Sequence, residues 1–187
     1  MHRLQVITAS TRPARVGPKI ATRFLDVAGR DATFEVEPID LAEVNLPLFD
    51  EPRHPRLRQY EHEHTRRWSE TIARGDAFVF VTPEYNHMAA PSLVNALDFL
   101  LHEWAYKPAG FVSYGGPVAG ARAVQAIKPM LTALKVVPMF ESVAIPFFPK
   151  FIGEDCVFRP EPPIEEAAVV MLRELHRWAG ALRSLRA

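Results

Sequence analysis

Four residues that can stiffen a chain, form hydrogen bonds and stack follow an apolar run at 77–81: Pro83, Glu84, Tyr85 and Asn86. Pro83 fixes its own φ and holds Thr82 in an extended conformation, so the exit from the predicted strand is rigid. A rigid turn can present main-chain groups to the edge of a flat heterocycle, and Tyr85 can supply an aromatic face. The alternative is an ordinary loop in which Ser92 caps the next helix, but that leaves Pro-Glu-Tyr-Asn unexplained.

A second group of polar residues follows the first predicted strand, in the stretch TASTRPARVGPKIA at 8–21. Its hydroxyls, guanidinium groups and glycine are Ser10, Thr11, Arg12, Arg15 and Gly17. Such groups ahead of a helix N-terminus suit a phosphate. The stretch matches neither GxGxxG nor the P-loop pattern, which disfavours a Rossmann dinucleotide site and an NTPase. Taken alone, it is interpreted equally well as a capped helix with solvated arginines.

Glycines and hydroxyls recur in a third stretch, VSYGGPVAGARA at 112–123. Gly115, Gly116 and Gly120 permit close approach of the backbone, so bare N–H groups can meet the electron-rich edge of a ligand. Ser113 and Tyr114 add hydroxyls. Because turns also use glycine, it is the position of this loop directly after a buried strand that makes it a candidate binding loop.

The periodicity of apolar residues alternates between that of strands and that of helices. Strands are expected at 4–7, 34–39, 77–81, 109–113 and 136–140. Helices are expected at 19–28, 57–74, 92–101, 120–135 and 164–185. This alternation predicts one α/β domain over 1–187, a three-layer sandwich whose five-stranded parallel sheet has the order 2-1-3-4-5. Because it contains Pro38, the strand at 34–39 is expected at a sheet edge.

The three polar loops should meet if this sheet forms. In such sheets, ligands bind outside the carboxyl ends of the strands, where the strand order reverses. One ligand satisfies all three loops, with a phosphate in the first and a tricyclic ring held by the second and third. This combination predicts FMN as the cofactor.

Composition and charge argue against several other kinds of partner. The chain is 48% hydrophobic and 24% charged with a net charge of zero, so it has no basic excess for a nucleic acid or an anionic membrane. No stretch approaches the roughly 18 apolar residues of a membrane span, and the lone Cys156 cannot form an intramolecular disulfide. We expect a soluble, cytoplasmic protein. His62 and His64 lie two apart on a predicted helix and should point in different directions, so no metal site is expected.

Three motifs resemble those of the NADPH-dependent FMN reductases, a group of flavodoxin-like fold that includes NAD(P)H:quinone reductases and azoreductases. They are STRPxRVGP, TPEYN followed by LxNALD, and KPxxxxSxGGxxxGxRA, and the resemblance covers roughly residues 3–140. Two positions depart from the pattern. Ala9 replaces a usual glycine, and NHMAA at 86–90 replaces NxSxP, which leaves the nicotinamide and acceptor preference open.

The resemblance implies specific residues for the cofactor. The residues that would hold the FMN phosphate are Ser10, Arg12, Arg15, Val16 and Gly17. Those that would line the ring are Pro83, Glu84, Tyr85 and Asn86, and those on its pyrimidine side are Ser113, Gly115 and Gly116. The resemblance also implies a homodimer or homotetramer with the flavin near an interface that the helix carrying Asn95, Leu97 and Asp98 helps to form.

The expected reaction is the transfer of a hydride from NADPH or NADH through FMN to a quinone, a free flavin or an azo-type acceptor. The flavin carries the chemistry and the protein positions it, so no side chain is required as an acid or base. His87 is the candidate proton donor, because its loop borders the ring and histidine titrates near neutrality. The alternatives are a flavodoxin-like electron carrier and a flavin-binding redox sensor, neither with turnover of its own.

Two further features bear on the substrate side of the site. Arg122 could attract a nicotinamide phosphate or pair with a carboxylate, and we expect the pair. The proline-rich segment 138–163 carries Phe147, Phe148 and Phe151. It is expected either to cap the acceptor pocket or to bury itself in a partner subunit.

Overall fold

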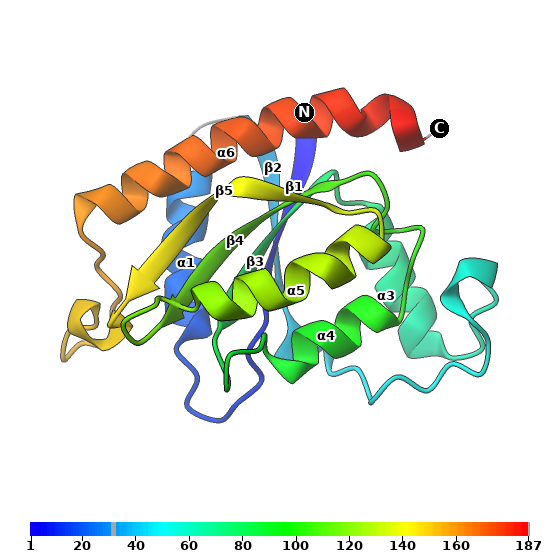
Figure 1. The fold of residues 1–187 in the computed structure, drawn as a ribbon, viewed down its shortest axis with the longest axis horizontal. Helices are drawn as coiled ribbons and strands as arrows, with labels where there is room; N and C mark the ends of the chain where they lie inside the picture. The colour runs from blue at the N-terminus through cyan, green and yellow to red at the C-terminus, as the bar shows by residue number, and fades with distance from the viewer. Residues whose placement is uncertain (31–32, 187) are drawn as a thin grey trace.

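The computed structural model describes residues 1–30 and 33–186, and it shows a sheet with helices on both sides (Figure 1). Within this part of the chain, five strands form the sheet in the order β2-β1-β3-β4-β5. They are β1 (His2–Thr8), β2 (Phe34–Asp40), β3 (Ala77–Pro83), β4 (Pro108–Gly115) and β5 (Val137–Pro146). All neighbouring strands pair in parallel. The predicted fold class and strand order are confirmed.

The helices form the two outer layers. The longer ones are α1 (Gly17–Ala28), α3 (Glu63–Ala73), α4 (Pro91–Asp98), α5 (Ala121–Ala133) and α6 (Pro162–Leu182). The short ones are α2 (Leu41–Val44) and the 3-10 helices η1 (Pro55–Leu57), η2 (Phe148–Phe151) and η3 (Arg183–Arg186). Helices α1 and α6 cover one face of the sheet, and α3, α4 and α5 cover the other (Figure 1). None of the helices in the described ranges is long and apolar enough to cross a membrane.

The central strand β3 is buried along its whole length. Because side chains alternate between the two faces of a strand, Val79 joins the core on the side of α1 and α6, and Phe80 joins the core on the side of α3 to α5. Trp68 and Trp104 are buried in that second core. With both faces covered by helices, β3 is a continuous apolar run rather than an alternating one.

The helix expected at 57–74 begins only at Glu63, so the first part of that prediction is wrong. Pro55 starts the 3-10 turn η1, which ends at Arg58 in a left-handed conformation with φ 51°. Tyr60 therefore lies before the helix. The turn chemistry of the preceding segment decides where the helix begins.

The last strand, expected at 136–140, continues to Pro146. It keeps pairing with β4 beyond a register irregularity between Ala109 and Phe111. The longer strand carries the chain to the carboxyl edge of the sheet. The residues that follow it, 147–150, therefore lie beside the loops after β1, β3 and β4.

The expectation that His62 and His64 point apart is wrong, because His62 precedes the helix instead of lying on it. Their rings stack with centroids 5.2 Å apart, and His64 Nε2 lies 2.9 Å from Asp50 Oδ1. Over residues 1–30 and 33–186, no group of three or more histidine, cysteine, aspartate or glutamate side chains is placed to hold a metal ion.

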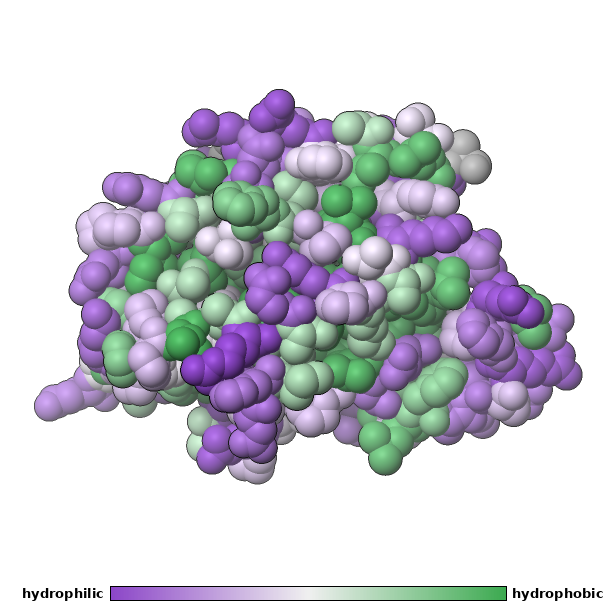
Figure 2. Space-filling model, in the orientation of Figure 1, coloured by the Kyte–Doolittle hydropathy of each residue, from purple (hydrophilic) through white to green (hydrophobic). Residues whose placement is uncertain are grey.

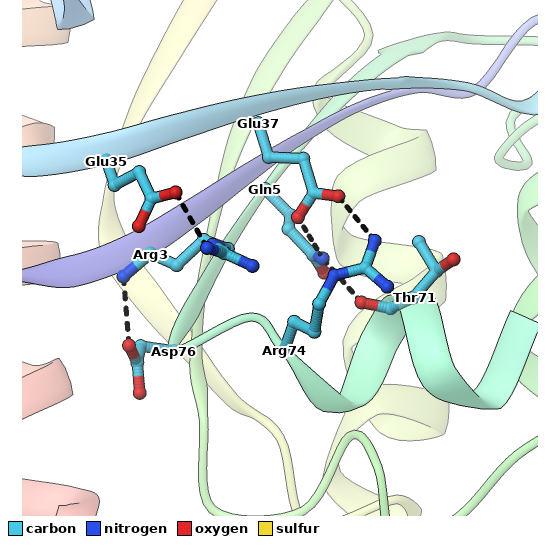
Figure 3. Close-up of polar contacts among 7 residues, drawn as sticks. All are labelled: Arg3, Gln5, Glu35, Glu37, Thr71, Arg74 and Asp76. Carbon is cyan, nitrogen blue, oxygen red and sulfur yellow. Dashed lines mark hydrogen bonds and ion pairs between the residues drawn. The ribbon is translucent and has the colours of Figure 1, made fainter.

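Polar side chains join β1, β2 and α3 along the exposed edge of the sheet (Figure 3). The buried Gln5 side chain donates to Glu37 Oε2 at 2.8 Å and to the carbonyl oxygen of Thr71 at 2.6 Å. Arg74 Nη2 donates to Glu37 Oε1 at 2.7 Å (Figure 3). These contacts explain why charged and apolar residues alternate along β2. Charged side chains along an edge strand also oppose pairing with other chains.

Candidate functional site

A cavity of about 680 Å³ lies at the carboxyl ends of the strands. The chain segments around it are those that leave β1, β3, β4 and β5, at the lower left of Figure 1 where the arrow of β5 ends. The predicted cofactor-binding residues that line the cavity are Ser10, Arg12, Arg15, Val16, Pro83, Glu84, Tyr85, Gly115 and Gly116. The strand order brings these loops together, because β3 pairs with both β1 and β4.

Hydroxyl and guanidinium groups of the first loop make different contacts. Ser10 is buried, and its Oγ lies 2.6 Å from the phenol oxygen of Tyr85 in the second loop. Arg15 Nη1 donates to Asp40 Oδ1 at 2.5 Å and to the carbonyl oxygen of Ser10 at 3.0 Å. The hydrogen bond that Arg15 donates to Asp40 raises the pKa of Arg15 further, so this side chain stays charged. Arg12 is exposed and forms no ion pair within the described residues.

Helix α1 follows this loop directly and begins without a side-chain cap. Its N-cap residue is Val16, and no side chain in the described chain accepts a hydrogen bond from the first turn. Pro18 has no N–H and the Lys19 N–H donates to the Val16 carbonyl oxygen at 3.0 Å, so within the described residues the Gly17 N–H is the one donor of the first turn without a partner. The helix start still carries the positive end of the helix dipole. Together with the exposed guanidinium of Arg12, this end of the helix can bind an anion.

Gly17 is needed for close packing and not for a turn of unusual backbone. An added Cβ at Gly17 would lie 3.0 Å from Tyr114 Oη and 3.1 Å from Thr8 Cγ2. Gly17 and Ser113 do not line the cavity, and Ser113 is buried in β4. Burial raises the pKa of the Tyr114 phenol, which keeps that ring neutral beside Arg15.

The second loop ends in a tight hairpin turn. Tyr85 and Met88 exchange two backbone hydrogen bonds of 2.9 and 3.0 Å. Between them Asn86 (φ 51°) and His87 (φ 68°) have left-handed backbones, which two-residue hairpin turns require and which histidine tolerates less well than asparagine. Both side chains are exposed and neither lines the cavity. A role for Asn86 in binding or for His87 in proton transfer stays a prediction.

The second and third loops are joined by an ion pair. Glu84 Oε1 accepts a hydrogen bond from Arg122 Nη1 at 3.1 Å, and Glu84 Oε2 accepts one from the Arg122 backbone N–H at 3.2 Å. The expected pairing of Arg122 with a carboxylate is confirmed. Ser92 does not cap α4; its hydroxyl donates to the carbonyl oxygen of Ala9, which joins α4 to the loop after β1.

Two glycines of the third loop have different structural roles. Gly120 has a φ of 80°, a conformation that other residues rarely adopt. Gly116 lines the cavity, and a Cβ added there would meet no heavy atom of the described chain within 4 Å. The space beside Gly116 is therefore free for a ligand to approach the backbone.

An aromatic wall completes the cavity, and the sequence did not identify its members as cofactor-site residues. Phe147, Phe148, Pro149 and Lys150 line it from the segment after β5. The Phe147 N–H donates to the carbonyl oxygen of Gly116 at 3.2 Å, and the Phe148 ring packs edge-on against Tyr114 at 5.3 Å. The sequence feature that could have identified this wall is the dense aromatic and proline content of 138–163. Phe151, by contrast, is buried against Phe158.

The residues present fit FMN. For an anion, the cavity offers Arg12, Ser10 and the loop that leads into α1. For a flat ring, it offers the open backbone at Gly116, the Tyr85 ring and the aromatic wall. Its volume of about 680 Å³ lies within the range of small-molecule sites. A site that combines anion-binding groups with flat apolar groups matches a phosphate joined to a planar ring.

Comparison with known proteins agrees with this geometry. The profile of the family described as NADPH-dependent FMN reductase matches residues 2–150. The chain is 40% identical over 148 residues to an NAD(P)H-dependent FMN reductase of Schizosaccharomyces pombe, covering 77% of this chain and 74% of that protein. It is 28% identical over 140 residues to a quinone reductase of Pseudomonas putida, covering 72% of each. A flavoenzyme NAD(P)H:(acceptor) oxidoreductase from Paracoccus denitrificans has the same fold, with a TM-score of 0.76, 20% identity and coverage of 97% of this chain and 98% of that one. The chain belongs to the NADPH-dependent FMN reductase family.

Proposed function

We propose that this protein is an FMN-dependent NAD(P)H oxidoreductase that passes two electrons to a quinone, a free flavin or an azo-type acceptor. The observation that carries the proposal is one cavity lined by Arg12 and the loop that leads into α1, and also by Gly116 and Tyr85. Bound there, FMN would supply the hydride chemistry. The relatives named for FMN reduction and quinone reduction support the same activity.

The contacts support different roles for the predicted binding residues. Arg12 and Ser10 would bind the phosphate, aided by the positive end of the α1 dipole. Arg15 would hold the loop in place through Asp40, because its guanidinium is already paired. Pro83, Glu84, Tyr85, Gly115 and Gly116 would border the ring, while Gly17 and Ser113 would support the loops from beneath.

The nicotinamide and the acceptor would use one face of the flavin, next to Phe147 and Phe148. These two rings line the cavity together with Tyr85 of the second loop, and Lys150 adds a cation to the same lining. Lys150 Nζ lies 3.6 Å from Glu161, an exposed and therefore weak pairing. A cation at the rim suits the phosphates of NADPH or NADH. Shared use of one face predicts ping-pong kinetics.

The chain would assemble as a homodimer or homotetramer through the face around α4. Leu48 is 85% exposed and Met88 is 52% exposed. Asn95 on α4 holds the Leu48 segment through hydrogen bonds with the Pro47 carbonyl oxygen and the Phe49 N–H. Apolar and polar residues are intermixed on the side of the molecule that carries α4 (Figure 2), as at many subunit interfaces. Light scattering coupled to gel filtration tests the assembly. A cytoplasmic location is part of the same proposal.

The decisive experiment is an anaerobic titration of the purified protein. We expect a yellow protein, or one that binds added FMN, whose visible absorbance is bleached within seconds by NADPH or NADH and restored by menadione. Steady turnover with menadione separates an oxidoreductase from a redox sensor. Failure of both nicotinamides to bleach bound FMN would instead identify an electron carrier, and a protein that binds no FMN would contradict the proposal altogether.

A further inference from the structure

Glu84 is an acidic residue in the wall of a cavity whose basic lining residues would by themselves favour a negatively charged ligand. Its side chain is only 11% exposed and it lines the cavity from the loop after β3. A carboxylate beside a flavin repels the negative charge that the ring gains on reduction, and this repulsion is stronger where water is partly excluded. Taken alone, Glu84 would therefore make the cofactor harder to reduce.

Arg122 of the third loop forms an ion pair with this carboxylate. Its guanidinium Nη1 lies 3.1 Å from Glu84 Oε1, and its backbone N–H donates to Glu84 Oε2 at 3.2 Å. The N-cap residue of α5 is Gly120, which has no side chain to accept a hydrogen bond. Glu84 thus takes the place of a cap for this helix from another loop, a position where negative charge is favoured. One carboxylate binds both the guanidinium and the first turn of α5.

From these contacts we propose that Arg122 is a positioning residue that acts through Glu84: it neutralises the carboxylate in the cavity wall and thereby raises the reduction potential of FMN bound there. The proposal rests on the proposed function. Glu84 joins the second loop to α5 through its hydrogen bonds, and Arg122 removes the electrostatic penalty of having that acid in the wall. The pair matters for the cofactor because both partners sit on the two loops expected to border its ring.

The test is the midpoint potential of the FMN-loaded protein, measured anaerobically against a reference dye. In Arg122→Gln the carboxylate loses its partner, so the potential should fall. In Glu84→Gln the amide oxygen can still accept from the Arg122 N–H, but the guanidinium is now unopposed, so the potential should rise. Arg122→Lys keeps the charge and should stay near the unaltered protein, and the double variant should lie between the two single ones.

A matched control removes the same charge elsewhere. Arg177 on α6 pairs with Glu174 at 2.7 Å and does not line the cavity, so Arg177→Gln should leave the potential unchanged. The proposal is overturned if Arg122→Gln and Glu84→Gln shift the potential in the same direction, if neither shifts it, or if Arg177→Gln shifts it as much.

The outcome also separates this proposal from the proposed function. If the unaltered protein binds FMN and is reduced by NADPH while the variants show equal potentials, this inference alone fails. If the unaltered protein binds no FMN, the proposed function fails and the inference fails with it. Should Arg122→Gln not fold, Glu84→Gln and Arg122→Lys still decide the matter, because a rise in the first and no change in the second are both required.

Discussion

The hydroxyl of Ser10 lies 2.6 Å from the hydroxyl of Tyr85, although 75 residues separate them in the chain. Ser10 is buried near the start of the first loop, and Tyr85 begins the hairpin of the second. The bond fixes the distance between the loop expected to hold a phosphate and the loop expected to border a ring. It is a direct structural link between two of the loops that line one cavity.

Tyr85→Phe tests this link, since it keeps the ring and removes the hydroxyl. A typical hydrogen bond contributes about 1 kcal/mol, so FMN affinity should fall roughly fivefold. Fluorescence titration measures the change. Tyr106→Phe is the control, because the Tyr106 hydroxyl contacts Lys135 at 3.3 Å and does not line the cavity. Equal FMN affinity in Tyr85→Phe and the unaltered protein would show that the bond does not organise the site.

Arg12→Gln should weaken FMN binding by about tenfold to a hundredfold, because hydrogen bonds to charged groups contribute about 1.5–3 kcal/mol. Riboflavin, which lacks the phosphate, should bind both proteins equally. Arg53→Gln removes another exposed arginine, one that contacts Gln59 at 2.5 Å and lies outside the cavity, and should change neither affinity. A parallel loss of riboflavin affinity in Arg12→Gln would assign Arg12 to the ring and not to the phosphate.

Gly116→Ala should separate binding from stability. The added methyl group would meet no heavy atom of the described chain within 4 Å, and Gly116 does not need a left-handed backbone. Stability in urea should therefore be unchanged or higher by up to about 1 kcal/mol. FMN affinity should fall by about tenfold or more, since the methyl group fills the space left for the ligand. Unaltered affinity would place the ring away from this backbone.

Gly75→Ala should have the opposite profile, with lower stability and unchanged FMN affinity. An added Cβ would lie 2.5 Å from Gln5 Oε1 and 2.8 Å from Gln5 Cδ. Gln5 cannot move aside easily, because its amide is held by Glu37 and Thr71 (Figure 3). Overpacking of this kind costs about 1–3 kcal/mol, measured by urea unfolding.

The control for Gly75→Ala is Gly180→Ala on the exposed side of α6. There the nearest atom to an added Cβ is His2 Nε2 at 3.7 Å, an ordinary contact. Alanine is the better helix former by about 1 kcal/mol, so Gly180→Ala should stabilise the protein. If both substitutions changed stability in the same direction, the clash with Gln5 would not be the cause.

Lys107 should give the stability a distinctive pH dependence. It is buried, its Nζ donates to the carbonyl oxygens of Ile72 and Ala73, and burial lowers its pKa to about 8 from 10.5. Below pH 8 the lysine is charged in both the folded and the unfolded chain. Between about pH 8 and 10.5 the unfolded chain binds more protons, so this group adds stability as the pH rises.

Lys107→Met should remove this contribution. The slope of unfolding free energy against pH should differ between the two proteins by at most about 1.4 kcal/mol per pH unit, from urea unfolding at pH 8 and 9.5. Tyrosines that ionise near pH 10 affect both proteins alike and cancel in the comparison. Parallel slopes would mean that the carbonyl oxygens of α3 hold the ammonium at its ordinary pKa.

The local patterns that predicted the fold are those that depend on neighbours in the chain. The run AFVFV identified β3 because a strand covered on both faces must be apolar at every position. Helix α1 was placed within two residues of its start, since Pro18 suits a first turn. The start of α3 was misplaced, because the left-handed Arg58 that ends the preceding turn leaves no mark on the apolar periodicity.

The sequence by itself determined the alternation of strands and helices, and with it the edge of the sheet at which polar loops meet. Only the tertiary structure decided that Arg15 pairs with Asp40 while Arg12 forms no ion pair within the described residues, that Phe147 and Phe148 line the cavity, and that His87 does not line it. The physical reason is the distance along the chain over which each kind of interaction acts. Periodicity and turn chemistry act over a few residues, whereas Arg15 meets Asp40 across 25 positions and Glu84 meets Arg122 across 38.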